Sequence, residues 1–260
     1  MKKIKIFQID AFANRVFAGN PAAVCPLDRW IDDGLMQDIA QENNLSETAF
    51  FVPLDKGYHI RWFTPVEEVD LCGHATLASA YAIFTYIDSS KNEVTFQSRS
   101  GPLTVGKSGD LLAMDFPAQP PSSCDPPSAL IQALSAKPAE VLGSEDYFVV
   151  FRSEQDVRGL NPDMGLLMKI GLRGVIVTAP GKEADFVSRF FDPKQGVNED
   201  PVTGSAHCAL VPYWARKLGK KDLLAHQVSK RGGELFCEDQ GDRVIISGRA
   251  VSYLQGVITI

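Results

Sequence analysis

The feature that most constrains the fold of this chain is an internal repeat. Residues 61–75 and residues 189–206 share one pattern: a strand that begins with arginine, a Phe-x-Pro turn, an acidic loop, and a glycine, a His or Ser and an alanine at the start of an apolar helix. The two glycines, Gly73 and Gly204, are 131 residues apart, about half of the 260-residue chain. A duplication of this kind predicts two halves of the same fold, which can face each other across a cleft.

The pattern of short apolar runs predicts an α+β protein with mostly antiparallel strands, not the regular βαβ alternation of a nucleotide-binding sheet. A capped amphipathic helix is expected from Asp32 or Asp33 to about Asn43, and buried helices over 75–87 and 205–218. The segments 64–71, which includes Glu68, and 192–202 are expected to be loops.

A change of composition marks the boundary between the two halves. Residues 117–127 hold five of the sixteen prolines and two serines, which is typical of a linker. We therefore expect an N-terminal half over 1–117 and a C-terminal half over 118–250. The last strand, about 251–260, is a candidate to pair back onto the N-terminal half.

Charge and cysteine usage exclude several classes of protein. The net charge of −6 without a basic run argues against a nucleic-acid partner. No stretch approaches the roughly 20 apolar residues of a membrane span, and the start lacks a signal-peptide core, so a cytoplasmic protein is expected. Five scattered cysteines without a CxxC pair argue against a disulfide framework or a structural zinc site.

The two glycine-rich helix starts are candidate anion sites. The first N–H groups of a helix lack internal partners and carry the positive end of the helix dipole. Gly73 and Gly204 are therefore expected to bind a substrate carboxylate, and the same donors would stabilise the charge that develops when a neighbouring carbon loses its proton. The alternative is that both glycines only permit tight turns.

Two polar side chains of the N-terminal half could move such a proton. Glu47 stands at the mouth of an apolar strand, where partial burial suits a general base; the alternative is a strand-edge glutamate capped by Ser46 or Thr48. His74 could bind the substrate or relay a proton, or it could be structural.

Two further residues are candidates for a role in the reaction, and each also has a structural explanation. Asp200 is a possible polar partner, although an Asp-Pro turn with Pro201 also explains it. Cys72 lies at a helix start, where the dipole would favour a thiolate base; the alternative is a small buried apolar residue.

Four motifs in register resemble the phenazine-biosynthesis PhzF-like family: residues 19–24, 44–50, 70–76 and 199–206. The resemblance implies a diaminopimelate epimerase-like fold, in which two pseudo-symmetric halves each form a curved sheet around a central helix, and it implies a homodimer. It further implies catalysis without metal or organic cofactor. It assigns catalysis to Glu47, His74 and Asp200, and substrate binding to a second group: Gly73, Gly204, Ser205, Thr203 and Cys72.

The expected function is therefore a cofactor-independent isomerase that moves a proton on a small carboxylic acid. The family's best-known member isomerises a dihydro-hydroxyanthranilate by an allylic proton shift. One alternative is an amino-acid epimerase with Cys72 and Glu47 as opposed bases. The second catalytic cysteine of diaminopimelate epimerases would fall near Pro201 or Val202, where this chain has no thiol. The other alternative is a catalytically silent carboxylate-binding protein.

Overall fold

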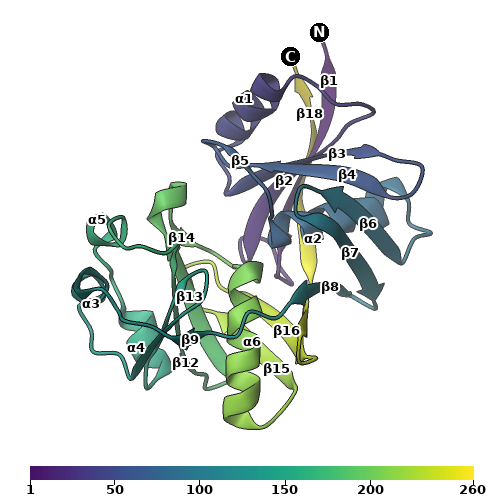
Figure 1. Cartoon of the computed structure of the whole chain (residues 1–260). Helices are drawn as coiled ribbons and strands as arrows, with labels where there is room; N and C mark the ends of the chain where they lie inside the picture. The colour runs from purple at the N-terminus through teal and green to yellow at the C-terminus, as the bar shows by residue number, and fades with distance from the viewer. The chain divides into compact units, whose positions relative to one another are not determined.

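The computed structural model describes residues 1–260 and divides into two compact units (Figure 1). The first unit comprises residues 1–115 and 247–260, and the second comprises residues 116–246. The sequence analysis placed these boundaries at 117 and 250. None of the helices combines the length and the apolar character that crossing a membrane requires.

The first unit is built on one mixed sheet. Its ladder runs in the order β18 (Ala250–Thr259), β1 (Lys3–Ala11), β2 (Asn20–Pro26), β3 (Glu47–Pro53), β4 (Tyr58–Phe63), β6 (Glu93–Ser98), β7 (Gly101–Ser108) and β8 (Leu111–Pro117). The short strand β5 (Glu68–Val69) also pairs with β4. All pairs are antiparallel except β2–β3 and β4–β6.

Helix α2 (Gly73–Ala82) is the centre of the first unit. Its residues from His74 to Ala80, and also Ala82, are buried, because the sequence is apolar on every face. The helix contacts β1, β2, β3, β7 and β18, so the sheet curves around it. A π-helical turn (Ile83–Ile87) follows α2.

Helix α1 (Asp33–Asn43) packs on β3 and β4 through one apolar face, formed by Met36, Ile39 and Ala40. Asp32 begins the helix by accepting the N–H of Leu35, and Asn44 ends it in the left-handed conformation.

The second unit has a similar sheet around α6 (Gly204–Leu218). Its ladder runs in the order β9 (Ser122–Ser123), β10 (Glu140–Gly143), β11 (Tyr147–Val150), β12 (Val175–Pro180), β13 (Phe186–Asp192), β15 (Asp222–Gln227) and β16 (Gly233–Asp239). The strand β14 (Val197–Asp200) pairs with β13, and β17 (Arg243–Gly248) follows β16. The remaining elements are α3 (Ser128–Leu134), α4 (Glu154–Gly159), α5 (Met164–Leu167) and a 3-10 turn (Pro193–Gln195).

Helix α6 is stabilised by aromatic packing and by a backbone hydrogen bond from outside the helix, which replaces the one that a proline cannot donate. Trp214 stacks on Phe186 at 5.8 Å and donates its indole N–H to Thr178 Oγ1 at 2.9 Å. Pro212 lies inside the helix and cannot bond to the carbonyl of Cys208 four residues earlier. The backbone N–H of Gln119, from the proline-rich segment, donates to that carbonyl at 2.9 Å instead. The buried carbonyl is thereby satisfied.

The strand pairings repeat from one unit to the other, element for element. The pairs β1–β2, β2–β3, β3–β4, β4–β5, β4–β6 and β6–β7 have the same directions as β10–β11, β11–β12, β12–β13, β13–β14, β13–β15 and β15–β16. In each unit the central helix follows the short strand β5 or β14. The internal repeat that the sequence indicated is therefore a repeat of topology.

An arginine–glutamate fork is part of the repeat. Arg61 on β4 donates from Nε and Nη2 to both oxygens of Glu68 on β5, at 2.7 and 2.8 Å. Arg189 on β13 does the same to Glu199 on β14, at 2.7 and 3.0 Å. The expectation that 64–71 and 192–202 are loops was wrong where β5 and β14 form. Strands β5 and β14 are too short to show a sequence period. The bidentate pairing with Arg61 also leaves the Glu68 side chain only 15% exposed.

Gly19 and Gly109 give a test of close packing in the first unit. Both adopt φ near +65°, at +65° and +63°, but a Cβ on Gly19 would lie 2.1 Å from the carbonyl oxygen of Ala11, whereas a Cβ on Gly109 meets nothing within 4 Å. Gly109→Ala should cost about 1–2 kcal/mol, for the left-handed backbone alone. Gly19→Ala should cost at least about 1 kcal/mol more, because of the clash. Urea unfolding of both variants measures the difference, and equal losses would contradict the account.

Candidate functional site

The structure brings Glu47 and His74 together in the first unit. Glu47 is the first residue of β3 and His74 is the second residue of α2. Glu47 Oε2 lies 3.1 Å from His74 Nε2, and the two side chains are 18% and 5% exposed. The Thr48 hydroxyl accepts a hydrogen bond from Asn43 Nδ2 at 3.1 Å.

The other ring nitrogen of His74 faces two further groups. Nδ1 lies 3.2 Å from Asn20 Nδ2 and 3.5 Å from Cys72 Sγ. An amide nitrogen only donates and a protonated imidazole donates from both nitrogens, so with Asn20 in this orientation Nδ1 accepts only while the ring is neutral. Burial alone would lower the pKa of His74, but Cys72 and Glu47 outweigh it and raise the pKa well above its ordinary value. His74 is thus held ready to carry a proton next to Glu47.

Cys72 is poorly suited to act as a thiolate. Burial, and then the negative charge of Glu47, raise the pKa of its thiol to about 11. Of the two interpretations that the sequence left open, the structure supports the small buried residue over the thiolate base, because desolvation of the thiolate outweighs the helix dipole at a residue that is 6% exposed. At neutral pH Cys72 is a thiol.

Glu47, Cys72 and His74 are also a possible metal-ligand set, with one atom of each within 4.8 Å of the others. Their arrangement does not suit chelation. The sulfur faces Nδ1 of His74 and the carboxylate faces Nε2, at different edges of the ring. One imidazole offers one nitrogen to an ion, so in this arrangement the three groups form a chain of proton donors and acceptors.

The two central helices begin without a side-chain cap. The N-cap residue of α2 is Cys72 and that of α6 is Thr203, and neither accepts a hydrogen bond from the first turn. By contrast, Asp32, Ser153 and Asp163 cap α1, α4 and α5. Uncapped N–H groups at the start of a buried helix form a site for an anion.

In the second unit the structure gathers Asp200, Thr203 and Ser205 around the start of α6. Thr203 Oγ1 donates to Asp200 Oδ2 at 2.6 Å. Gln227, at the end of β15, accepts the N–H of Thr203 at 2.8 Å and donates to the carbonyl of Asp200 at 2.8 Å. Asp200 is thus the last residue of a strand, bonded to the residue that begins the helix. Gln227 was missed by the sequence analysis, because nothing near it in sequence indicates this contact.

His207, to which the sequence gave no role, is a structural residue. It is fully buried on α6 and its Nδ1 lies 2.8 Å from the carbonyl oxygen of Thr203. Burial lowers the pKa of His207 to about 4, so the ring is neutral at physiological pH.

Three charged residues near the start of α6 were also missed. Arg173 pairs with Asp146, and Arg173 Nη2 donates to Ser205 Oγ at 3.3 Å. Asp192 comes from the Phe-x-Pro turn and is 5% exposed. Burial raises the pKa of its carboxyl to about 7, the charge of Arg173 opposes this, and Asp146 adds to it. These residues are far apart in sequence and share no motif.

The candidate residues thus form two groups, one in each unit. Glu47, Cys72, Gly73 and His74 surround the start of α2, and Asp200, Thr203, Gly204 and Ser205 surround the start of α6. Their roles in catalysis and substrate binding, and the cleft that they were expected to share, stay predictions.

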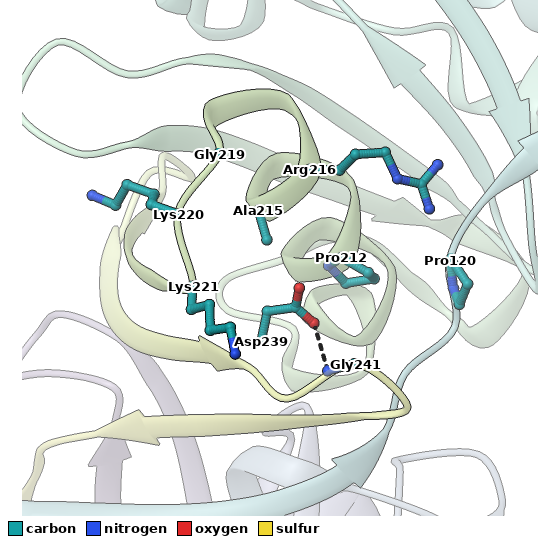
Figure 2. A pocket seen from close by; sticks show the side chains of 9 residues that line it. All are labelled: Pro120, Pro212, Ala215, Arg216, Gly219, Lys220, Lys221, Asp239 and Gly241. Atoms are coloured by element: carbon teal, nitrogen blue, oxygen red, sulfur yellow. Dashed lines mark hydrogen bonds between the residues drawn. The ribbon is translucent and has the colours of Figure 1, made fainter.

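A pocket of about 410 Å³ in the second unit lies at the opposite end of α6 from Gly204 (Figure 2). It is lined by residues at the end of the helix, among them Ala215, Arg216 and Gly219. One of its lysines, Lys220, pairs with Asp185 at 2.6 Å. The pocket contains none of the candidate residues, and the cations there complement the negative end of the helix dipole.

The raised pKa of Asp192 predicts how the free energy of unfolding depends on pH. Its pKa is raised from 3.8 to about 7 in the folded chain, so the folded state keeps a proton that the unfolded state releases. The contribution of Asp192 to the free energy of unfolding should therefore be fully present below about pH 4, fall as the pH rises to 7, and level off above.

Urea unfolding of wild type and Asp192→Asn from pH 4 to 8 measures this contribution as the difference between the two curves. The exposed Asp222→Asn is the control and should run parallel to wild type. Parallel curves for wild type and Asp192→Asn would contradict the assignment.

Comparison with known proteins places the chain in a family. Residues 9–256 match the PhzC-PhzF family, described as phenazine biosynthesis-like protein. The chain is similar to an uncharacterized isomerase of Pseudomonas aeruginosa, with 54% identity over 98% of this chain and 99% of that protein. It is also similar to the crystal structure of a PhzF-family protein of Enterococcus faecalis, with 46% identity, a TM-score of 0.97 and full coverage of both chains.

A more distant likeness concerns the fold alone. A hydroxyproline epimerase of Agrobacterium vitis superposes with a TM-score of 0.64 at 9% identity, over 98% of this chain and 92% of the epimerase. The mixed sheets and central helices therefore form the two-halved diaminopimelate epimerase-like fold. With the match over almost its whole length, the chain belongs to the PhzF-like family of isomerases.

Proposed function

We propose that this isomerase moves a proton on a small carboxylic acid with Glu47 as its acid and base, without a cofactor. The observation that supports the proposal most is the 3.1 Å contact between the partly exposed Glu47 carboxylate and buried His74, next to the uncapped start of α2. A base on β3 and a proton-carrying partner on α2 thus lie beside the candidate anion site at the start of α2.

The proposed reaction has two proton transfers. The substrate carboxylate binds the N–H groups at both glycine-led helix starts, Gly73 and Gly204, which stabilises the negative charge that develops on the substrate. Glu47 takes a proton from a carbon next to an unsaturated group and becomes a neutral acid. It then returns the proton to a different carbon, and the carboxylate is restored. His74, whose Nε2 lies 3.1 Å from Glu47 Oε2, positions the carboxylate and stabilises its charge between turnovers.

The proposal assigns the corresponding helix start of the second unit to the same reaction. Gly204, Ser205 and Thr203 would bind the substrate, and Asp200 would act as a polar partner of it. The repeated topology and the equally uncapped start of α6 support this assignment.

Solvent exchange tests the base. In ²H₂O, wild type should introduce deuterium at one carbon of dihydro-hydroxyanthranilate or of an acid from a panel of β,γ-unsaturated acids, as seen by NMR. Glu47→Gln removes the base but keeps the shape of the side chain, and should lower the exchange rate by about 10²–10⁴-fold.

Cys72→Ala is the matched control, because Cys72 contacts the same histidine from the other side of the ring. It should change the exchange rate less than about tenfold, since a thiol with a pKa near 11 supplies little thiolate at neutral pH. Equal exchange by wild type and Glu47→Gln would show that Glu47 is not the base.

An epimerase with Cys72 and Glu47 as opposed bases is the second candidate, because both residues flank His74. It requires that Cys72→Ala and thiol alkylation abolish the reaction, with inversion at one carbon and no shift of a double bond. A catalytically silent binder would bind an acid and show no exchange in either variant or in wild type.

A further inference from the structure

Arg173 is fixed beside the start of α6 by a buried carboxylate. Asp146, whose side chain is 3% exposed, accepts from Arg173 Nε at 2.9 Å and from Nη2 at 2.5 Å. Asp146 also accepts the backbone N–H of Gly174 at 2.9 Å, and the Arg173 guanidinium lies over the Phe190 ring at 5.4 Å. Burial opposes the charge of Arg173, but the pairing with Asp146 outweighs it and raises the pKa of Arg173 above its ordinary value. The guanidinium is therefore charged and rigidly held.

The same guanidinium contacts the second residue of α6. Arg173 Nη2 lies 3.3 Å from Ser205 Oγ. A guanidinium has only donors, so Ser205 Oγ must be the acceptor. The hydroxyl proton of Ser205 then points away from Arg173, and no other group of the chain accepts it.

The hydroxyls of α2 behave differently. Thr76 donates to the carbonyl of Cys72 at 2.6 Å and Ser79 donates to the carbonyl of Ala75 at 2.7 Å, the usual bond four residues back along a helix. Ser205 makes no such bond. Its proton is therefore available to an acceptor outside the chain, at a helix start where the N–H groups are also uncapped.

We propose that Arg173 is a positioning residue that turns the Ser205 hydroxyl into a donor for the substrate carboxylate at the start of α6. Arg173 acts through Ser205, because Asp146 already neutralises its charge. This inference rests on the proposed function for the place of the substrate carboxylate, but its test needs no catalysis.

The test is a double-mutant cycle with sodium acetate as the probe. Amide NMR shifts of Gly204 and Ser205 report acetate binding at this helix start, separately from any binding elsewhere. Arg173→Lys keeps a cation for Asp146, so the fold is preserved, but it loses the planar fork that reaches Ser205. We expect Arg173→Lys and Ser205→Ala each to weaken acetate binding about five- to tenfold.

In the Ser205→Ala background, Arg173→Lys should cause no further loss, since the group through which it acts is gone. Arg158→Met, which breaks the exposed pair with Glu154, is the control and should bind acetate as wild type does. The same loss of acetate binding from Arg173→Lys in both backgrounds would show a direct charge effect and overturn the proposal. Acetate binding that Arg173→Lys or Ser205→Ala leaves unchanged would also overturn it, as would the absence of a saturable amide shift in wild type. If the exchange experiment fails and this cycle succeeds, only the proposed catalysis is wrong.

Discussion

The rest of the structure depends on burying the two central helices, α2 and most of α6. Such a helix is stable in water only when other elements surround it, and in the first unit the sheet curves around α2 for this reason. Enclosure also removes water from the first turn, whose N–H groups have no partner within the helix. A side-chain cap would normally supply one, but neither α2 nor α6 has it. The fold therefore leaves, at the start of each central helix, a set of donors that suits a carboxylate.

The same burial decides which group near α2 can act as a base. Cys72 and Glu47 both lie next to His74, and both could in principle take a proton. Desolvation penalises the charged form of the thiol, which raises its pKa to about 11. Glu47, at the start of β3, keeps a side chain that is 18% exposed. The difference in burial thus favours the Glu47 carboxylate over the Cys72 thiol as the proposed base.

Much of this arrangement could be predicted from the sequence, and the omissions have physical reasons. The glycine-led helix starts, the repeat and the mostly antiparallel sheets follow from local patterns, whereas the role of Glu47 comes from the family resemblance and stays a prediction. The strands β5 and β14 were missed because the Arg61–Glu68 and Arg189–Glu199 forks that stabilise them join residues seven and ten positions apart, without a period. Arg173, Asp146 and Gln227 were missed because only the folded chain brings them to α6. The sequence left two interpretations of Cys72 open, a thiolate and a buried thiol, since it shows the helix dipole but not the extent of burial.

The central claim is that the Glu47 carboxylate, and not the Cys72 thiol, exchanges the proton with the substrate. A crystal structure with anthranilate, an aromatic acid that has no proton to transfer, tests it most directly through one distance. The account predicts that a ring carbon lies within about 3.5 Å of a Glu47 carboxylate oxygen, with the anthranilate carboxylate on the N–H groups at Gly73. Anthranilate bound with its ring carbons against Cys72 Sγ and out of reach of Glu47 would contradict it.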